Sequence, residues 1–297
     1  MSKRVGIIGA GLMGLPMSIN WLARGWELMG YDVAPSRTAL LAEAGARVAK
    51  QIEELAQFSE LIVLSLPSSA ALDDVIATLA SCTGARHIIA ETSTLAVEDK
   101  ERAAALLAAS SGAKLLDCPI IGGAVQAKTG MLTILASGDE EACGTTESLW
   151  GDTARQYRYV GGFGTASRLK FVVNHFVSTT TVLIAETMHF AECAGLDLRL
   201  VNEIIGNSPA SSGIWLARVP LMLSGVYDDP TTKAAELAIP FKDTRIIADF
   251  IEQHGAPTPL FHAALDIYRV AQEQNRANQD AAALFDVFDS LITQRNP

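Results

Sequence analysis

The feature that most constrains the fold is a glycine-rich turn between an apolar run and a helical pattern near the amino terminus. Arg4–Ile8 reads as a short buried strand, and Gly9-Ala10-Gly11-Leu12-Met13-Gly14 follows at once. In a G-x-G-x-x-G turn the first glycine allows the tight bend, the second admits a phosphate group, and the third lets the helix pack closely. We therefore expect a dinucleotide to bind here, with a glycine turn that serves only packing as the alternative. The expected contacts are Gly9, Gly11, Leu12, Met13 and Gly14.

The next strand pattern concerns the adenosine end of such a ligand. Glu27–Tyr31 ends at Asp32, and a carboxylate at this position can bond both ribose hydroxyls while it repels a 2′-phosphate. Arg37 lies a little further along the chain and could hold a 2′-phosphate instead. Because the carboxylate stands at the strand end, the sequence favours NAD over NADP as the cofactor.

Strand and helix patterns alternate up to about residue 161. Apolar runs at 61–66, 87–90, 114–117 and 131–136 predict further strands. Ligands of open α/β sheets bind beyond the carboxyl ends of the strands, so the loops that follow these runs are expected to carry site residues. The loops are Leu66-Pro67-Ser68-Ser69, placed over the cofactor, Glu91-Thr92-Ser93-Thr94, and Cys118-Pro119-Ile120-Ile121-Gly122-Gly123.

The second half of the chain has a helical pattern throughout. From Thr165 to about Cys193 it contains neither proline nor glycine, and Gly195 supplies the stop. Later helical patterns are punctuated by Pro209, Pro220, Pro240 and Pro257. We expect an α/β Rossmann dinucleotide-binding domain over residues 1–162, followed over residues 163–297 by an all-α domain built on the long helix.

Composition excludes several classes of protein. A formal charge of −10 argues against nucleic acid as a partner, because phosphate backbones need a basic surface. The uncharged stretch 5–23 is broken by glycines and a proline, so we expect no membrane span there. The four cysteines have no spacing suited to a metal ion, and free thiols fit a cytoplasmic protein.

The long helix carries the strongest candidates for chemistry. It follows Gly161-Gly162-Phe163-Gly164 and places Lys170 and Asn174 on one face, one turn apart. A partly desolvated lysine can exchange protons near neutral pH, and an amide can bond a hydroxyl or a carboxylate. The alternative is a lysine whose stem packs while its amine reaches water. His175 points away from Asn174 and is expected to be a packed or surface histidine.

These motifs together resemble those of the β-hydroxyacid dehydrogenases, the family that contains 3-hydroxyisobutyrate, tartronate semialdehyde and threonate dehydrogenases. The resemblance covers nearly the whole chain, with the motifs in the family order. The matching segments are Gly9 to Gly14, Glu91-Thr92-Ser93-Thr94, Asp117-Cys118-Pro119-Ile120-Ile121-Gly122-Gly123, Gly161 to Asn174 with Lys170, and Lys242-Asp243.

The resemblance implies reversible hydride transfer between NAD and a small hydroxy acid. Lys170 is then the general acid/base, and Asn174 anchors the substrate. Gly122 and Gly123 offer backbone N–H groups to a substrate carboxylate, whereas Thr94 and Lys242 line the nicotinamide end. Without the resemblance, Lys242 and Asp243 read only as a surface pair.

Three positions depart from the family pattern. Ile121 stands where the family usually has serine, so a hydroxyl donor to the substrate is lost. We expect either a less polar substituent on the substrate or a carboxylate held by the backbone alone. Ala166 replaces a glycine and Val173 replaces an asparagine in the long helix.

Other activities and assembly are also open at this point. An imine reductase or a non-catalytic dinucleotide-binding protein would share the architecture, but such relatives usually lack the lysine that stands at Lys170. The apolar helical half suggests a homodimer or homotetramer.

Overall fold

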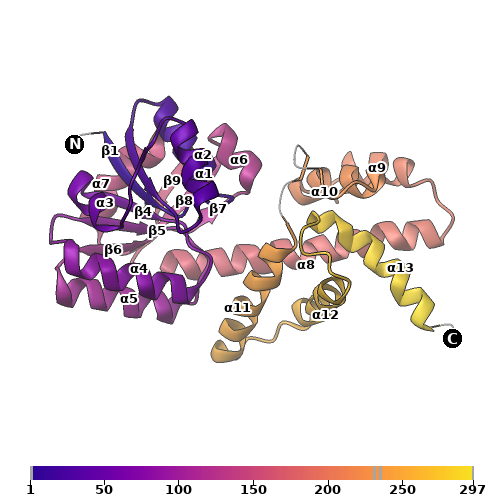
Figure 1. Cartoon of the computed structure of the whole chain (residues 1–297). Coiled ribbons are helices and arrows are strands. Elements are labelled where there is room, and N and C mark those ends of the chain that lie inside the picture. Colours follow the sequence, from indigo (N-terminus) through magenta and orange to yellow (C-terminus); the bar gives the residue numbers. More distant parts are fainter. Residues whose placement is uncertain (1–2, 230–231, 234–235, 296–297) are drawn as a thin grey trace. The chain divides into compact units, whose positions relative to one another are not determined.

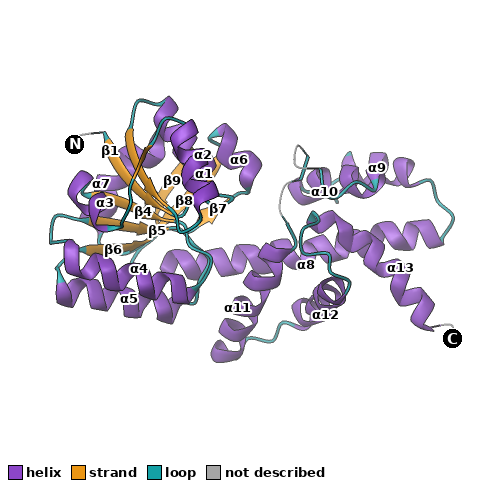
Figure 2. Ribbon diagram, viewed as in Figure 1, coloured by secondary structure: helices purple, strands orange, loops and turns teal. Residues whose placement is uncertain are grey.

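The computed structural model describes residues 3–229, 232–233 and 236–295 (Figures 1 and 2). Contacts divide the chain into two compact units, Met1–Lys170 and Phe171–Pro297. The boundary after residue 162 that the sequence suggests stays a prediction. Residues 165–170 group with the first unit because they bond to the end of one of its strands, as described below.

The first unit alternates strands and helices. Its strands are β1 (Arg4–Ile8), β2 (Glu27–Tyr31), β3 (Arg47–Val48), β4 (Leu61–Leu64), β5 (Ile88–Glu91), β6 (Lys114–Asp117), β7 (Ile120–Ile121), β8 (Leu132–Ala136) and β9 (Ala154–Tyr159). Its helices are α1 (Gly14–Ala23), α2 (Pro35–Glu43), α3 (Glu53–Phe58), α4 (Ser69–Cys82), α5 (Val97–Ser110), α6 (Ala124–Thr129) and α7 (Glu140–Gly151).

The main sheet has six parallel strands in the order β3-β2-β1-β4-β5-β6. The strand order reverses between β1 and β4, because the chain moves outward from β1 to β3 and then returns to the other side of β1. In sheets of this kind the ligand crevice lies at the carboxyl ends of the two strands that flank the reversal. The doubly wound fold expected from the sequence is confirmed.

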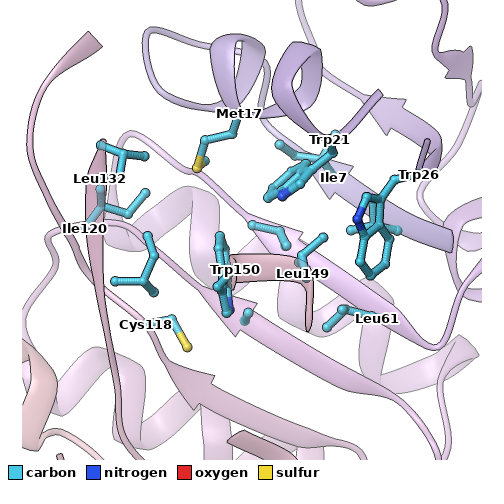
Figure 3. Close-up of a cluster of buried hydrophobic side chains, with 14 of the residues drawn as sticks. Ile7, Met17, Trp21, Trp26, Leu61, Cys118, Ile120, Leu132, Leu149 and Trp150 are labelled. Atoms are coloured by element: carbon cyan, nitrogen blue, oxygen red, sulfur yellow. The ribbon is translucent and has the colours of Figure 1, made fainter. Parts of the chain in front are cut away.

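Alternate residues of the central strands enter two separate apolar layers. On β1, Val5 and Ile7 join the layer that contains α1, whereas Ile8 joins the layer that contains α4 and α5. The first layer is built around Trp21 and Trp150, whose ring centroids lie 5.7 Å apart (Figure 3). Burial on both faces explains why these strands read as continuous apolar runs.

A second sheet in the order β7-β8-β9 continues the first unit. An isolated bridge between Asp117 and Ser137 connects the end of β6 to the end of β8. β9 could not be predicted, since none of its residues is buried and no apolar alternation marks it.

The second unit is helical in its described residues, apart from an isolated bridge between Glu236 and Asp280. The helices are α8 (Thr165–Cys193), which begins in the first unit, α9 (Leu198–Gly206), α10 (Gly213–Ser224), α11 (Ala238–His254), α12 (Pro259–Glu273), the short η1 (Ala281–Ala283) and α13 (Leu284–Arg295). The expected bounds of the long helix are confirmed.

One helix boundary expected from the sequence was wrong. Pro220 lies inside α10 rather than between helices. A proline removes one backbone donor within a helix, but Val219 and Met222 beside it are buried in the core of the unit, and this burial offsets the loss. Within the part of the chain that the structure describes, none of the helices combines the length and apolar character needed to cross a bilayer.

Candidate active site

The turn after β1 has the geometry that its glycines predicted. Gly9 has a φ of +96°, which favours glycine, and a Cβ there would overlap the carbonyl oxygen of Ser65. A Cβ on Gly14 would overlap the carbonyl oxygen of Gly9, so this glycine lets α1 start close to the turn. Gly11 differs, because a Cβ there would meet no atom within 4 Å. Gly11 is therefore not required for packing, and the open space beside it fits the approach of a dinucleotide phosphate.

Two further features of this turn suit a dinucleotide. Among the described residues, no side chain caps the start of α1, which leaves this helix end open to an anion. Asp32 follows β2, and its carboxylate accepts hydrogen bonds from the amides of Ala10 at 2.7 Å and Ala34 at 2.8 Å. These bonds fix the carboxylate beside the glycine turn. Arg37 is exposed on α2.

The loops after β4 and β5 are bonded to each other. The amide of Leu66 donates to Ser93 Oγ at 2.7 Å, and the amide of Ser93 donates to Glu91 Oε1 at 2.8 Å. Pro67 is exposed and Thr94 is half-buried. Leu66, Pro67 and Thr94 thus all lie at the carboxyl edge of the sheet, and their contacts with a cofactor stay a prediction.

The loop after β6 holds the expected substrate residues. Ile121 is half-buried at the end of β7, where it pairs with Thr133 of β8. Gly122 has a φ of +124°, and a Cβ there would lie 2.9 Å from Leu132 Cδ2. The amide of Gly123 donates to Gln126 Oε1 at 3.0 Å, so a substrate carboxylate has to replace this side chain to use that amide.

The start of α8 is fastened to the same edge of the sheet. The amide of Ser167 donates to Asp117 Oδ2 at 2.8 Å, and the amide of the buried Ala166 donates to Ser137 Oγ at 3.1 Å. Lys170 follows Ser167 by one turn, and it is 9% exposed. This burial favours a lysine held within the protein over one with its amine in open water, and the catalytic role of Lys170 stays a prediction.

Beneath these loops lies an ion cluster that the sequence did not reveal. Lys100 Nζ is 2.6 Å from Glu91 Oε2 and 2.9 Å from Asp117 Oδ1, and all three side chains are 0% exposed. Lys100 also donates to Ser167 Oγ at 3.1 Å, and Ser167 Oγ donates to Asp117 Oδ1 at 2.6 Å. Glu91 and Asp117 occupy paired positions on neighbouring strands. Two carboxylates buried side by side need a cation, and this sign is available once the strand order is known.

The electrostatics of the cluster favour its charged form. Burial alone raises the pKa of Asp117, but the Lys100 ammonium and the hydrogen bonds from Ser167 hold this pKa below its ordinary value. Burial likewise acts to lower the pKa of Lys100, and the charges of Asp117 and Glu91 overcome it and raise that pKa. Lys100 is therefore a fixed cation and not a group that exchanges protons near neutral pH.

The second unit places the remaining candidates on α8 and α11. Asn174 Nδ2 donates to Asp243 Oδ2 at 2.8 Å, and Lys242 Nζ lies 3.3 Å from Asp243 Oδ1. Asp243 is buried, so Lys242 and Asp243 are not a simple surface pair. His175 stacks on Phe261 with ring centroids 4.8 Å apart, and burial lowers its pKa, as expected for a packed histidine.

One group of side chains has the composition of a weak metal site. His189, Glu192 and Asp289 bring possible ligand atoms within 4.8 Å of one another. His189 Nδ1 lies 3.4 Å from Asp289 and 3.8 Å from Glu192, and both carboxylates are largely exposed. These contacts are those of an exposed ion-pair group, and the group is assigned no role.

The sheet order, the glycine turn with its open space at Gly11 and the carboxylate of Asp32 define a dinucleotide-binding protein of the doubly wound class. Two family models match the chain. Residues 4–161 match the NAD-binding domain of 6-phosphogluconate dehydrogenase, and residues 164–288 match the model described as NAD-binding of NADP-dependent 3-hydroxyisobutyrate dehydrogenase. The chain belongs to the β-hydroxyacid dehydrogenase family and is an NAD(P)-dependent oxidoreductase acting on the CH–OH group of hydroxy acids.

Similar proteins match this chain over nearly their full length. An NAD-dependent L-serine dehydrogenase of Pseudomonas aeruginosa is 28% identical over 97% of this chain and 98% of its own. A solved 3-hydroxyisobutyrate dehydrogenase of Mycobacterium tuberculosis with L-serine has a TM-score of 0.86 at 23% identity, covering 97% and 99% of the two chains. An imine reductase from a Pseudomonas species reaches a TM-score of 0.62 at 23% identity, covering 96% and 99%. The fold is thus shared with imine reductases, and activity has to be argued from the site.

Proposed function

We propose that the protein catalyses reversible hydride transfer between NAD and a small hydroxy acid of the 3-hydroxyisobutyrate or threonate kind, with Lys170 as the general acid/base. One observation carries this proposal. The turn of α8 that bears the buried Lys170 is bonded through Ser167 to Asp117, the residue from which the substrate loop starts. A lysine held at the carboxyl edge of the sheet and largely removed from water suits proton transfer better than solvation.

In oxidation, Lys170 acts as a neutral amine and accepts the hydroxyl proton of the substrate at Nζ. The carbinol C–H bond breaks with both electrons leaving as hydride, and a carbonyl group forms. The nicotinamide supplies the chemistry of hydride acceptance and, in reverse, of donation. The amide of Asn174 anchors the substrate and is oriented by Asp243, while the amides of Gly122 and Gly123 bind the carboxylate.

The remaining expected contacts serve the cofactor. Asp32 binds the adenosine ribose, since its carboxylate is already fixed beside the glycine turn. Thr94 and Lys242 line the nicotinamide end, as in the family. Selection of NAD over NADP rests on the repulsion between Asp32 and a 2′-phosphate.

The substrate is proposed to carry an apolar substituent near Ile121. Serine at this position could donate a hydrogen bond, whereas isoleucine offers only an apolar surface. The carboxylate of the substrate is then held by backbone amides, and the side chain at position 121 selects the substituent.

A panel assay tests this function. NADH formation is measured with 3-hydroxyisobutyrate, L-threonate and L-serine, and the oxidation of NADH and of NADPH is measured with a cyclic imine. We expect turnover with at least one hydroxy acid and none with the imine. Imine reduction without hydroxy acid oxidation contradicts the proposal. No turnover with any compound of the panel, with intact NAD binding, favours a non-catalytic protein.

We also propose that the protein is a homodimer or homotetramer in which a second copy covers α8. Val172, Phe176, Leu183 and Phe190 are each more than half exposed. Their spacing places them on one face of the helix. A row of large apolar side chains of this kind marks an interface. Light scattering after gel filtration tests it, and a monomer at micromolar concentration contradicts it.

The compartment and the other partners follow from composition. We propose a cytoplasmic protein with no nucleic acid partner. Four free cysteines and a formal charge of −10 support both points.

A further inference from the structure

Lys100 is a fully buried charged side chain in the first unit, and the proposed chemistry does not use it. Its side chain is 0% exposed, so it cannot touch a substrate or a cofactor. Removing an ammonium group from water costs several kcal/mol in proteins even after relaxation, roughly the same order as the gain from good partners. Stability alone is therefore a weak reason for its presence.

The partners of Lys100 come from three separate segments. Its ammonium group donates hydrogen bonds to Asp117 at the end of β6 and to Ser167 in the first turn of α8, and it forms an ion pair with Glu91 at the end of β5. Each of these segments leads directly into expected site residues. The site residues that follow these three segments are Thr94, Ile121 to Gly123, and Lys170, in that order.

The network extends in two directions, each time by two hydrogen bonds through one serine. Through the amide and hydroxyl of Ser93, Glu91 is connected to the amide of Leu66 in the loop after β4. Through the Ser137 hydroxyl, Asp117 is connected to the amide of Ala166. One buried cation thus connects the loops that end three neighbouring strands with the start of the helix that carries the acid/base.

We propose that Lys100 and Ser167 are positioning residues that fix Lys170 relative to the cofactor and substrate loops of the same unit. This proposal rests on the proposed role of Lys170. Hydride transfer is sensitive to such positioning, since a displacement of about 1 Å can cost about 100-fold in rate. Loss of the network therefore lowers kcat and leaves the binding of NAD, which depends on the glycine turn and Asp32, close to normal.

The chain offers a matched pair of variants for the test. Ser167→Ala removes a buried hydroxyl from the cluster. Ser59→Ala removes a buried hydroxyl at the opposite end of the sheet, where Ser59 Oγ lies 2.9 Å from the carbonyl oxygen of Arg4 and 3.0 Å from that of Leu61 and donates its one proton to either of them. A merely structural role predicts wild-type activity per folded molecule in both variants, with a larger loss of stability in Ser167→Ala because Ser167 bonds charged groups.

The experiment measures kcat and KM with 3-hydroxyisobutyrate, L-threonate and L-serine, the Kd of NAD, the urea midpoint and amide hydrogen exchange, with Lys170→Ala as reference. We expect Ser167→Ala to lower kcat by about 10- to 100-fold at an NAD Kd within about twofold of wild type, with faster exchange in residues 91–94, 117–123 and 165–170. Ser59→Ala keeps wild-type kcat.

The possible failures are distinct. Wild-type kcat in Ser167→Ala, beside an impaired Lys170→Ala, overturns the positioning role alone. Wild-type turnover in Lys170→Ala overturns the proposed function. Should none of the three acids be turned over, exchange decides: protection of the three segments unchanged in Ser167→Ala overturns the positioning role as well.

Discussion

Replacement of Lys100 by methionine isolates the energetics of the buried cluster. Methionine fills a similar volume, but Glu91 and Asp117 are left buried without a cation. Breaking a buried ion pair by removing one partner costs about 3–5 kcal/mol. Protonation limits this cost, because neutralising a carboxyl group of ordinary pKa at pH 7 takes about 4 kcal/mol, or about 1.4 kcal/mol per pH unit. Both routes predict a loss of about 3–5 kcal/mol in the free energy of unfolding of the first unit.

The pH dependence of this loss has a definite sign. In the wild type the pKa of Asp117 lies below its ordinary value, so its contribution is present above the unfolded pKa and is lost as pH falls through the folded one. Without Lys100, burial raises the pKa of Asp117, and the folded variant binds an extra proton. The deficit of Lys100→Met therefore shrinks as pH falls, by about 2 kcal/mol between pH 7 and pH 5.5.

Urea titration followed by tryptophan fluorescence measures both effects, since Trp21, Trp26 and Trp150 all lie in the first unit. Arg102→Met is the matched control. Arg102 lies on the same helix and pairs with Asp73 at 3.0 Å, but both side chains are about half exposed. Its replacement is expected to leave stability near wild type. A Lys100→Met protein as stable as Arg102→Met shows that the buried cation does not stabilise the first unit. A loss of stability that does not change with pH shows that no buried carboxyl group takes up a proton in the variant.

Three further predictions concern the cofactor and the substrate. Gly11→Ala is expected to weaken NAD binding in a fluorescence titration without lowering the urea midpoint, whereas Gly14→Ala costs about 1–3 kcal/mol of stability because its Cβ overlaps the Gly9 carbonyl; the reverse pattern contradicts the assignment of these glycines. Asp32→Ala is expected to lower the ratio of kcat/KM for NAD over NADP by about tenfold or more, because repulsion of a 2′-phosphate is lost, and an unchanged ratio removes Asp32 from cofactor choice. Ile121→Ser is expected to shift kcat/KM from 3-hydroxyisobutyrate toward L-serine and L-threonate by about tenfold or more, and no shift means that position 121 does not contact the substituent.

The sequence predicted the elements whose signals are local. The glycine turn needs only neighbouring residues, and the bounds of α8 follow from an unbroken helical pattern between glycines. β9 has no buried residue and therefore no apolar signal. The helix boundary predicted at Pro220 was wrong because the neighbours of this proline are held by core packing, which a single segment of sequence does not reveal.

The ion cluster could not be predicted from the sequence for a different reason. Lys100 stands among Glu98, Asp99, Glu101 and Arg102, a run that reads as a solvated helix face. Its partners lie far away along the chain and meet it only when the sheet forms. The pairing of Glu91 with Asp117 across neighbouring strands could have indicated a missing cation, but it requires the strand order first.

Single-turnover hydride transfer in Lys170→Ala is the sharpest test of Lys170 as the general acid/base. Enzyme saturated with NAD is mixed with 3-hydroxyisobutyrate, L-threonate or L-serine, and NADH absorbance is followed. If Lys170 is the general acid/base, NAD is reduced about 10²- to 10⁴-fold more slowly than in the wild type. The Kd for NAD is unchanged, and added methylamine restores part of the rate. A Lys170→Ala enzyme that reduces NAD at the wild-type rate contradicts this role.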